Sequence, residues 1–341
     1  MKNKFIIIAI ILLLLLVNPK TIRIFSESIR KDSIEVDIMK SIDIDRNIKY
    51  TEHDNNLVYY NEDYLKSINT KLEEIFKIKF NSNKINLESN RFLDVLDKEN
   101  NIIYSIDDKG SVVSKKKVHK DGIMYKSIDN ESYLYTYKKD DKNITNIYNN
   151  ELNLVKSITL KGLATDIDYS KDYIYITTIN IDNKMNSMIY RYDYNGNLKG
   201  EKQIENSILL DCILKDENIY LIEKNKVSIV DKDMKIKNEF KVNDIKSYSN
   251  LLKDSIYILE ENGSIKLIND SKIEDIKFKE DNLDGIVNIH NGVIGYVDNK
   301  IIDKKGIELR KFEEDIKNIE IIKEDMFVVE LENSIKIIKI K

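Results

Sequence analysis

The chain is poor in the residues that form disulfides, redox centres and kinks. Its 341 residues include no tryptophan, one cysteine and one proline. A single cysteine excludes an intramolecular disulfide and a multi-cysteine zinc site. Because Cys212 lies inside the apolar run 208–214, we expect it to be a small buried hydrophobe. No proline interrupts the chain after residue 32, so long series of paired strands are allowed.

Neither sign of charge dominates. The chain has 55 Lys and Arg against 59 Asp and Glu, and its formal net charge is −4. This balance provides no basic patch, so we exclude nucleic acid as a partner. With 42% hydrophobic residues, 20 Tyr and 9 Phe, the chain has enough apolar material for a folded core.

An apolar segment begins the chain. Lys2 and Lys4 precede an unbroken apolar run from Phe5 to Val17, as in an export signal. As a helix this run spans about 20 Å, short of the ~30 Å hydrocarbon core. No A-x-A-like cleavage site or lipidated cysteine follows it, so we favour an uncleaved signal-anchor at 1–25 over a cleaved signal. We expect a single-pass protein of the cell membrane, held through residues 5–17, with its folded domain outside the cytoplasm.

Two strand-and-turn motifs recur after residue 32. The first is a turn followed by a strand that usually carries an aliphatic residue beside an aromatic one, as in 55–59, 171–175 and 216–220. The second is an apolar strand ending in Asp or Asn, a short turn and another strand. The residues that open these turns are Asn69, Asp107, Asn149, Asp193, Asp231, Asn269 and Asp303.

The spacing of the turn-opening residues indicates a propeller. They are 34 to 44 residues apart, close to the period of a four-stranded propeller blade. Asp and Asn suit the first turn position because their side chains bond backbone amides two residues on, and Gly110, Gly196 and Gly306 supply positive φ in three of the turns. We predict an all-β fold, a β-propeller; a β-solenoid and two stacked sandwiches are the alternatives.

The end of the chain predicts how the ring closes. Residues 334–338 repeat the pattern of 264–268, but the chain stops before a fourth strand could follow. The run from Asp32 to Asp43 alternates apolar residues and can cover the open edge. We therefore predict eight four-stranded blades, with seven as the alternative, and a division into an anchor at 1–25, a linker and ring-closing strand at 26–45 and a propeller at 46–341. Ile340 and Lys341 are expected to lie past the strand core.

The texture of the blades points to a known group. Second strands carry Ile-Tyr pairs, and residues 188–198 form a third-to-fourth hairpin, Met-Ile-Tyr-Arg-Tyr-Asp-Tyr-Asn-Gly-Asn-Leu. Over residues 32–341 this resembles the quinoprotein-like (PQQ-like) β-propellers, which include membrane-anchored members in low-GC bacteria. The quinone enzymes of that group carry a tryptophan docking motif and adjacent cysteines, which this chain lacks. The resemblance therefore implies the fold, and we expect no cofactor.

Residues for chemistry are few. The three histidines, His53, His119 and His290, are isolated in sequence, and no Gly-x-Ser-x-Gly elbow is present. Metal binding or catalysis by these residues would need several blades to converge on one point. We expect no catalytic residues.

Carboxylates are the stronger candidates, because the first strand of each propeller blade lines the central channel. Asp166 and Asp168 are two residues apart and thus share one face of a strand. Asp211, Asp43 and Asp45 could point into the same channel. Such acids could bind calcium or a cationic ligand, or act on a glycan. Solvated acids bridged to water and to lysines are the simpler interpretation, so Asp166, Asp168 and Asp211 are weak metal candidates.

These observations favour a binding protein over an enzyme. We expect a non-enzymatic module of the cell envelope that presents a propeller face to envelope or membrane proteins, because the chain joins a rigid ring to a tether without a recognisable catalytic set. The alternatives are a ligand- or metal-binding sensor that uses the channel acids, and an enzyme acting on glycans.

Overall fold

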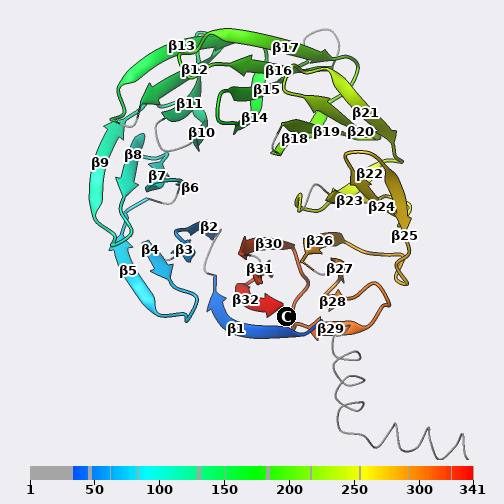
Figure 1. Ribbon diagram of the computed structural model, residues 1–341. Helices are drawn as coiled ribbons and strands as arrows, with labels where there is room; N and C mark the ends of the chain where they lie inside the picture. The colour runs from blue at the N-terminus through cyan, green and yellow to red at the C-terminus, as the bar shows by residue number, and fades with distance from the viewer. Residues whose placement is uncertain are drawn as a thin grey trace, which may run out of the picture.

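The chain forms a ring of eight four-stranded antiparallel sheets in the computed structural model, which describes residues 34–44, 48–61, 63–82, 84–128, 132–149, 151–181, 185–215, 217–252, 255–290, 292–323 and 325–340 (Figure 1). Each sheet is one blade, numbered here 1 to 8 in chain order from the blade that begins with β2. The first strand of each blade lies beside the central channel and the last lies at the outer edge (Figure 1). The prediction of eight blades is confirmed, and the alternative of seven is wrong.

Blades 1 to 4 follow one another without interruption of the strand order. Their strands are β2 (Lys49–His53), β3 (Asn56–Asn61), β4 (Tyr64–Ile68), β5 (Glu74–Lys79); β6 (Ile85–Ser89), β7 (Leu93–Asp97), β8 (Ile102–Ile106), β9 (Val112–Lys117); β10 (Gly122–Ile128), β11 (Ser132–Lys139), β12 (Lys142–Asn149), β13 (Leu154–Leu160); β14 (Leu163–Tyr169), β15 (Ile174–Asn180), β16 (Asn186–Tyr192) and β17 (Leu198–Ile204).

Blades 5 to 7 repeat this order, and blade 8 is composite. The strands are β18 (Leu209–Lys215), β19 (Asn218–Glu223), β20 (Lys226–Asp231), β21 (Ile236–Lys241); β22 (Ile245–Tyr248), β23 (Ser255–Glu260), β24 (Ile265–Asn269), β25 (Ile273–Ile276); β26 (Gly285–Ile289), β27 (Gly292–Val297), β28 (Lys300–Ile302), β29 (Glu308–Lys311); β30 (Asn318–Lys323), β31 (Met326–Glu330), β32 (Ser334–Ile340) and, from the start of the chain, β1 (Val36–Asp43).

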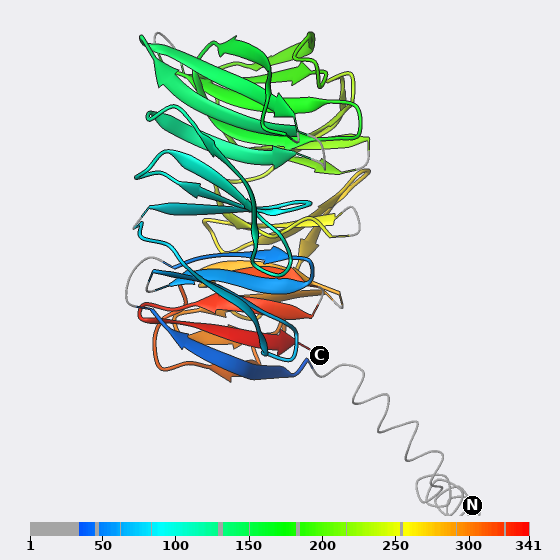
Figure 2. The same ribbon diagram turned by 90° about the vertical axis from the view of Figure 1, so that its left-hand side faces the viewer.

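Blade 8 is closed by the two ends of the described chain. β1 pairs antiparallel with β32, from Val36 opposite Ile340 to Asp43 opposite Ser334, with a register shift between Ile38 and Lys40. Figure 2 shows the two strands side by side. The predicted closing strand is therefore present. The expectation that Ile340 lies past the strand core is wrong, because Ile340 is buried and ends β32.

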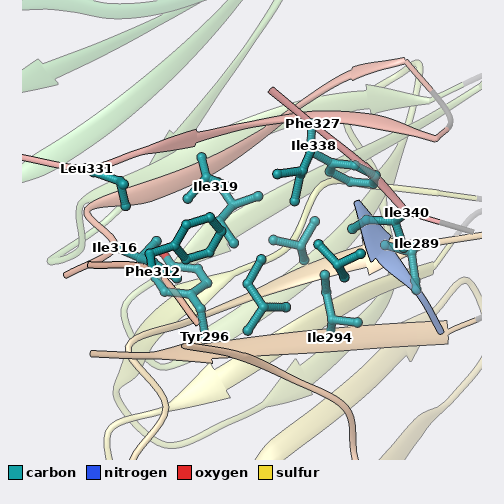
Figure 3. Close-up of a cluster of buried hydrophobic side chains, with 14 residues drawn as sticks. Ile289, Ile294, Tyr296, Phe312, Ile316, Ile319, Phe327, Leu331, Ile338 and Ile340 are labelled. Atoms are coloured by element: carbon teal, nitrogen blue, oxygen red, sulfur yellow. The ribbon is translucent and has the colours of Figure 1, made fainter. Parts of the chain in front are cut away.

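The hydrophobic core is divided among the junctions between blades. The described residues form eight buried apolar clusters, one between each pair of neighbouring blades around the ring. The cluster between blades 7 and 8 packs Ile294 and Tyr296 against Phe327 and Ile338 (Figure 3). Because each blade buries both faces against its neighbours, its middle strands are almost continuously apolar.

The seven predicted turns contain the predicted hydrogen bonds from backbone amides to the side chain of the opening residue. In all seven, the side-chain Oδ1 of the opening Asp or Asn accepts hydrogen bonds from two backbone amides at 2.7–3.1 Å. Three residues after the opening residue, six of these turns have positive φ. Gly110, Gly196 and Gly306 occupy this position in three turns, and Leu72, Leu152 and Met234 in the other three.

The proposed anchor at 1–25 lies outside the described residues, as does Asp45. In the part of the chain that the structure describes, no helix is long and apolar enough to cross a membrane.

Candidate functional site in the central channel

The channel acids predicted from sequence lie on the first strands of two adjacent blades. Asp166 and Asp168 are on β14, and Asp211 is on β18. Each accepts a hydrogen bond from the backbone amide of the residue that follows it, at 2.8 Å from Ile167, 2.7 Å from Tyr169 and 2.8 Å from Cys212. The inner edge of a first strand has no partner strand, so its outward N–H groups need other acceptors. These carboxylates supply them.

Asp168 also joins two blades. Its second carboxylate oxygen accepts a hydrogen bond from the backbone amide of Leu214 on β18, at 3.0 Å. A single side chain therefore bonds the first strands of blades 4 and 5 at the channel wall. A charged acceptor makes such bonds stronger than neutral ones.

Burial and crowding shift the ionisation of this group. Burial, followed by the charges of Asp211 and Asp168, raises the pKa of Asp166 to about 6, although the Ile167 amide and Lys126 act in the opposite direction. Burial also raises the pKa of Asp168, against its two amide donors and Lys126. The pair therefore gains protons more readily than ordinary aspartates do.

Sequence reasoning missed three further members of the channel wall. Glu88 on β6 lies 3.6 Å from Lys126 on β10, measured between Oε2 and Nζ. Tyr248 on β22 faces Asp211, whose charge helps burial to raise the tyrosine pKa. All three lie on first strands, so aligning the sequence blade by blade would have placed them beside the channel.

Other sequence candidates are dispersed or misplaced. Asp43 does not enter the channel, because it ends β1 in the outermost position of blade 8 and pairs with Ser334. Cys212 is buried, as expected, and burial raises its thiol pKa. Within the described ranges no set of three His, Cys, Asp or Glu side chains could hold a metal ion. The metal assignment of Asp166, Asp168 and Asp211 stays a prediction, and the bonds seen at these residues are to backbone amides.

The histidines lie on different parts of the ring. His53 is buried at the end of β2, and its Nδ1 lies 3.0 Å from the Ser89 hydroxyl. His119 stacks on Tyr137 at a centroid distance of 4.4 Å. His290 lies in the turn between β26 and β27. The three side chains therefore belong to three separate surroundings.

An acidic cavity lies between blades 6 and 7. It has a volume of about 710 Å³. Six partly or fully exposed acids, Glu261, Glu280, Asp281, Asp284, Asp298 and Glu308, line it together with Lys246 and Lys300. The acidic wall would favour a positively charged partner.

Comparisons with known sequences do not establish a family for this chain. No family model matches the chain. Among curated proteins, Reticulocyte-binding protein homolog 1 of Plasmodium falciparum (isolate 3D7) is 27% identical over 285 residues, covering 79% of this chain and 9% of that protein. The chain thus spans less than a tenth of that relative, and the identity does not establish a family.

Solved structures of other propellers superpose over most of the ring. BamB from Moraxella catarrhalis has a TM-score of 0.64 at 8% identity, with 89% of this chain and 99% of that chain covered. The WD40 domain of SCAP from fission yeast has a TM-score of 0.61 at 10% identity, with coverages of 90% and 98%. BBS1N, solved in complex with ARL6DN, has a TM-score of 0.52 at 11% identity, with coverages of 83% and 86%. At these identities the likeness shows the fold alone: the chain is a β-propeller.

Proposed function

We propose that this chain is a non-enzymatic, membrane-anchored β-propeller of the quinoprotein-like type, which acts as a protein-interaction scaffold in the cell envelope. The observation that carries the proposal is the acidic cavity of about 710 Å³ between blades 6 and 7. A rigid ring with a charged cavity on its surface can hold a partner without a catalytic group. The BBS1N structure, solved with ARL6DN, is an example of a similar fold with a protein bound.

The cavity defines the chemistry of the partner. Its six partly or fully exposed acids outnumber its two lysines and leave it negative, so the partner presents a basic segment. The contact should weaken with salt, because exposed charges are screened over about 10 Å at 0.1 M ionic strength.

Charge reversal tests the cavity. Glu280→Lys together with Asp281→Lys should abolish co-purification of membrane partners from crosslinked cells. The control, Glu151→Lys with Glu205→Lys, makes the same charge change at two exposed residues outside the cavity and should retain them. Equal recovery of the same partners by both double variants would refute the cavity as the binding site.

The membrane tether is tested separately. The mature protein should fractionate with membranes, and mass spectrometry should find its N-terminal residues intact. A mature chain that starts near Ser26 or later would contradict the anchor, and the protein would then be secreted.

A ligand-binding sensor is the second candidate, favoured by the crowded carboxyls of Asp166 and Asp168. If they hold calcium, the ion should raise Tm, and at about 100 times its Kd the gain would be about 2.7 kcal/mol. Asp166→Asn with Asp168→Asn should abolish that rise. If the chain is only a scaffold, calcium leaves Tm unchanged and the double variant still recruits partners.

A further inference from the structure

Strand β7 contains two buried aspartates with opposite surroundings. Asp97 receives four hydrogen bonds, from the Ser82 hydroxyl at 2.7 Å, the Glu99 and Asn100 amides at 3.1 Å and the Asn100 side chain at 2.7 Å. Asp94 has no exposed surface and receives one, from the Ser105 hydroxyl at 2.6 Å. Its other oxygen, Oδ2, has no hydrogen-bond partner among the described residues.

Asp94 lies at the junction between blades 2 and 3. In the sheet of blade 2 it is directly opposite Glu88 on one side and Ser105 on the other. Across the junction, Tyr125 and Ser127 of β10 face it, and their hydroxyls are also enclosed without a well-formed hydrogen bond. Three buried polar oxygens, Asp94 Oδ2 and the two hydroxyls, thus gather at one place without a well-formed hydrogen bond, which is costly for an ionised carboxyl group.

The charged groups around Asp94 oppose its ionisation. Glu88 is a like charge directly opposite on the neighbouring strand, which is destabilising when both are ionised. Lys126 of β10 pairs with Glu88 rather than with Asp94, and Tyr133 of β11 is the remaining titratable group. Beyond this shell, Arg91 acts on Tyr133 and Asp166 acts on Glu88.

Burial is the main cause that raises the pKa of Asp94 to about 7, with Glu88 adding to it and the hydroxyls of Ser105, Tyr125 and Ser127 reducing it. The neutral acid carries an O–H group that can donate to the oxygen of Tyr125 or Ser127. The carboxylate instead keeps a full charge in an enclosed site, and the hydroxyls of Ser105, Tyr125 and Ser127 offset only part of that cost.

We propose that Asp94 is a proton-binding site that controls the contact between blades 2 and 3: the neutral acid tightens the junction, and ionisation loosens it. The sign follows from linkage, since the folded protein holds this proton more strongly than the unfolded chain does. The stabilisation is complete below about pH 4 and is lost as the pH rises to about 7. The junction is therefore tighter in mildly acidic surroundings than in mildly basic ones.

The test measures amide hydrogen exchange in β10 and β7 of the full-length chain at pH 5.5 and pH 8, after correction for intrinsic exchange rates. The wild type should lose protection at pH 8 in these strands more than in β26, on the far side of the ring. Asp94→Asn imitates the neutral acid and should keep the pH 8 protection of β10 close to its pH 5.5 value. Asp97→Asn, on the same strand, should lower protection at both pH values and leave the pH difference in place.

A second variant keeps the test valid if Asp94→Asn does not fold. Tyr125→Phe leaves the carboxyl in place but removes a hydroxyl that lowers its pKa, so the loss of protection should move to higher pH. Infrared difference spectra should show a protonated carboxyl that titrates near pH 7 in the wild type and is missing from Asp94→Asn. A pH dependence of the junction that is identical in wild type, Asp94→Asn and Tyr125→Phe would overturn the proposal.

Discussion

Blade 8 and blade 3 have the same four-stranded sheet but are closed in different ways. In blade 3 the strands are consecutive, and the Asn149 turn leads directly from β12 to β13. In blade 8 the equivalent outer strand is β1, and Lys336 bonds the Ser41 hydroxyl across 295 residues of chain. Blade 3 can therefore close by a local event, whereas blade 8 closes only when the whole ring is present.

This difference teaches where the ring is vulnerable. Closing a loop costs roughly (3/2)RT ln n, so a joint across about 300 residues is several kcal/mol more expensive than one across a short turn. The contacts of β1 must offset this cost, and its side chains Val36 and Ile38 pack into the cluster between blades 7 and 8. The closing strand thus binds the ring in the way a separate peptide would.

The largest expected effect follows from removing that strand. Deleting residues 34–43 exposes the edge of β32 and opens the cluster between blades 7 and 8. The ring should therefore lose most of its free energy of unfolding, which for folded domains is typically about 5–15 kcal/mol. Circular dichroism melting of the variant should show no cooperative transition near the wild-type Tm. Asp43→Asn, at an exposed side chain of the same strand, should leave Tm nearly unchanged. Wild-type melting of the deletion variant would remove the closure argument.

A matched pair of core substitutions sharpens the comparison. Ile338 on β32 and Ile147 on β12 are both fully buried in the third strand of their blades. Replacing either with Ala should cost about 2–5 kcal/mol in denaturant unfolding, because a methyl-lined cavity remains. Hydrogen exchange should separate them. Ile338→Ala should speed exchange in β1, while Ile147→Ala should leave β1 protected, and equal exchange of β1 in both would contradict separate closure.

A smaller loss of stability is expected from the turn between the third and fourth strands, which blade 8 lacks. Leu152 has a φ of 60° and is buried, so its side chain offsets the strain of a left-handed backbone. Leu152→Gly relieves about 1 kcal/mol of strain but loses about 1.5–3 kcal/mol of side-chain burial, a net loss of roughly 0.5–2 kcal/mol. Leu72→Gly is the control, since Leu72 is only partly buried at the same turn position and should lose less. Denaturant melts that rank the two variants the other way would contradict this explanation.

The blades could be predicted from the sequence because their signals are local. An Asp or Asn side chain that bonds amides two to four residues on needs no distant partner, so Asp231 and Asp303 marked their turns correctly. Closure was also predictable, because the last blade lacks a fourth strand and the strand at the start of the chain has no other partner in sequence. The register of β1 was not, since it depends on packing, and Ile340 was therefore misplaced.

The sites depend on contacts between blades, which a linear pattern does not contain. Asp43 was wrongly assigned to the channel. The sequence shows that Asp43 lies in or near a strand, but it does not show which position that strand takes in its blade. Asp94 gave no signal at all, because it lies within a short buried strand and its partners Ser105 and Tyr125 come from two other strands. Glycine predicted the positive φ in three turns. The positive φ of Leu152 and Met234 could not be predicted in this way, because these residues adopt it with a buried side chain.

The smallest expected effect tests the bonding inside a single local turn. The Asp193 carboxylate accepts hydrogen bonds from the backbone amides of Asn195 and Asn197 and from the Asn197 side chain. Lys199 Nζ lies 3.0 Å from Asp193 Oδ2. Burial acts to raise its pKa, but the bonds from Asn197 and Lys199 outweigh burial and lower the pKa to about 2. The stability it contributes is therefore present above about pH 4 and lost as the pH falls towards 2. Because solvent screens the site, Asp193→Ala should lower the free energy of unfolding by only about 1 kcal/mol at pH 7, and the wild type and the variant should have similar stabilities near pH 2.

The control is Asp108→Ala, at an exposed residue in the turn of blade 2, and it should cost less. A cost at Asp193 that spreads to faster exchange in β1 would mean that the turns and the closing strand are coupled, and that local and distant closure are one event.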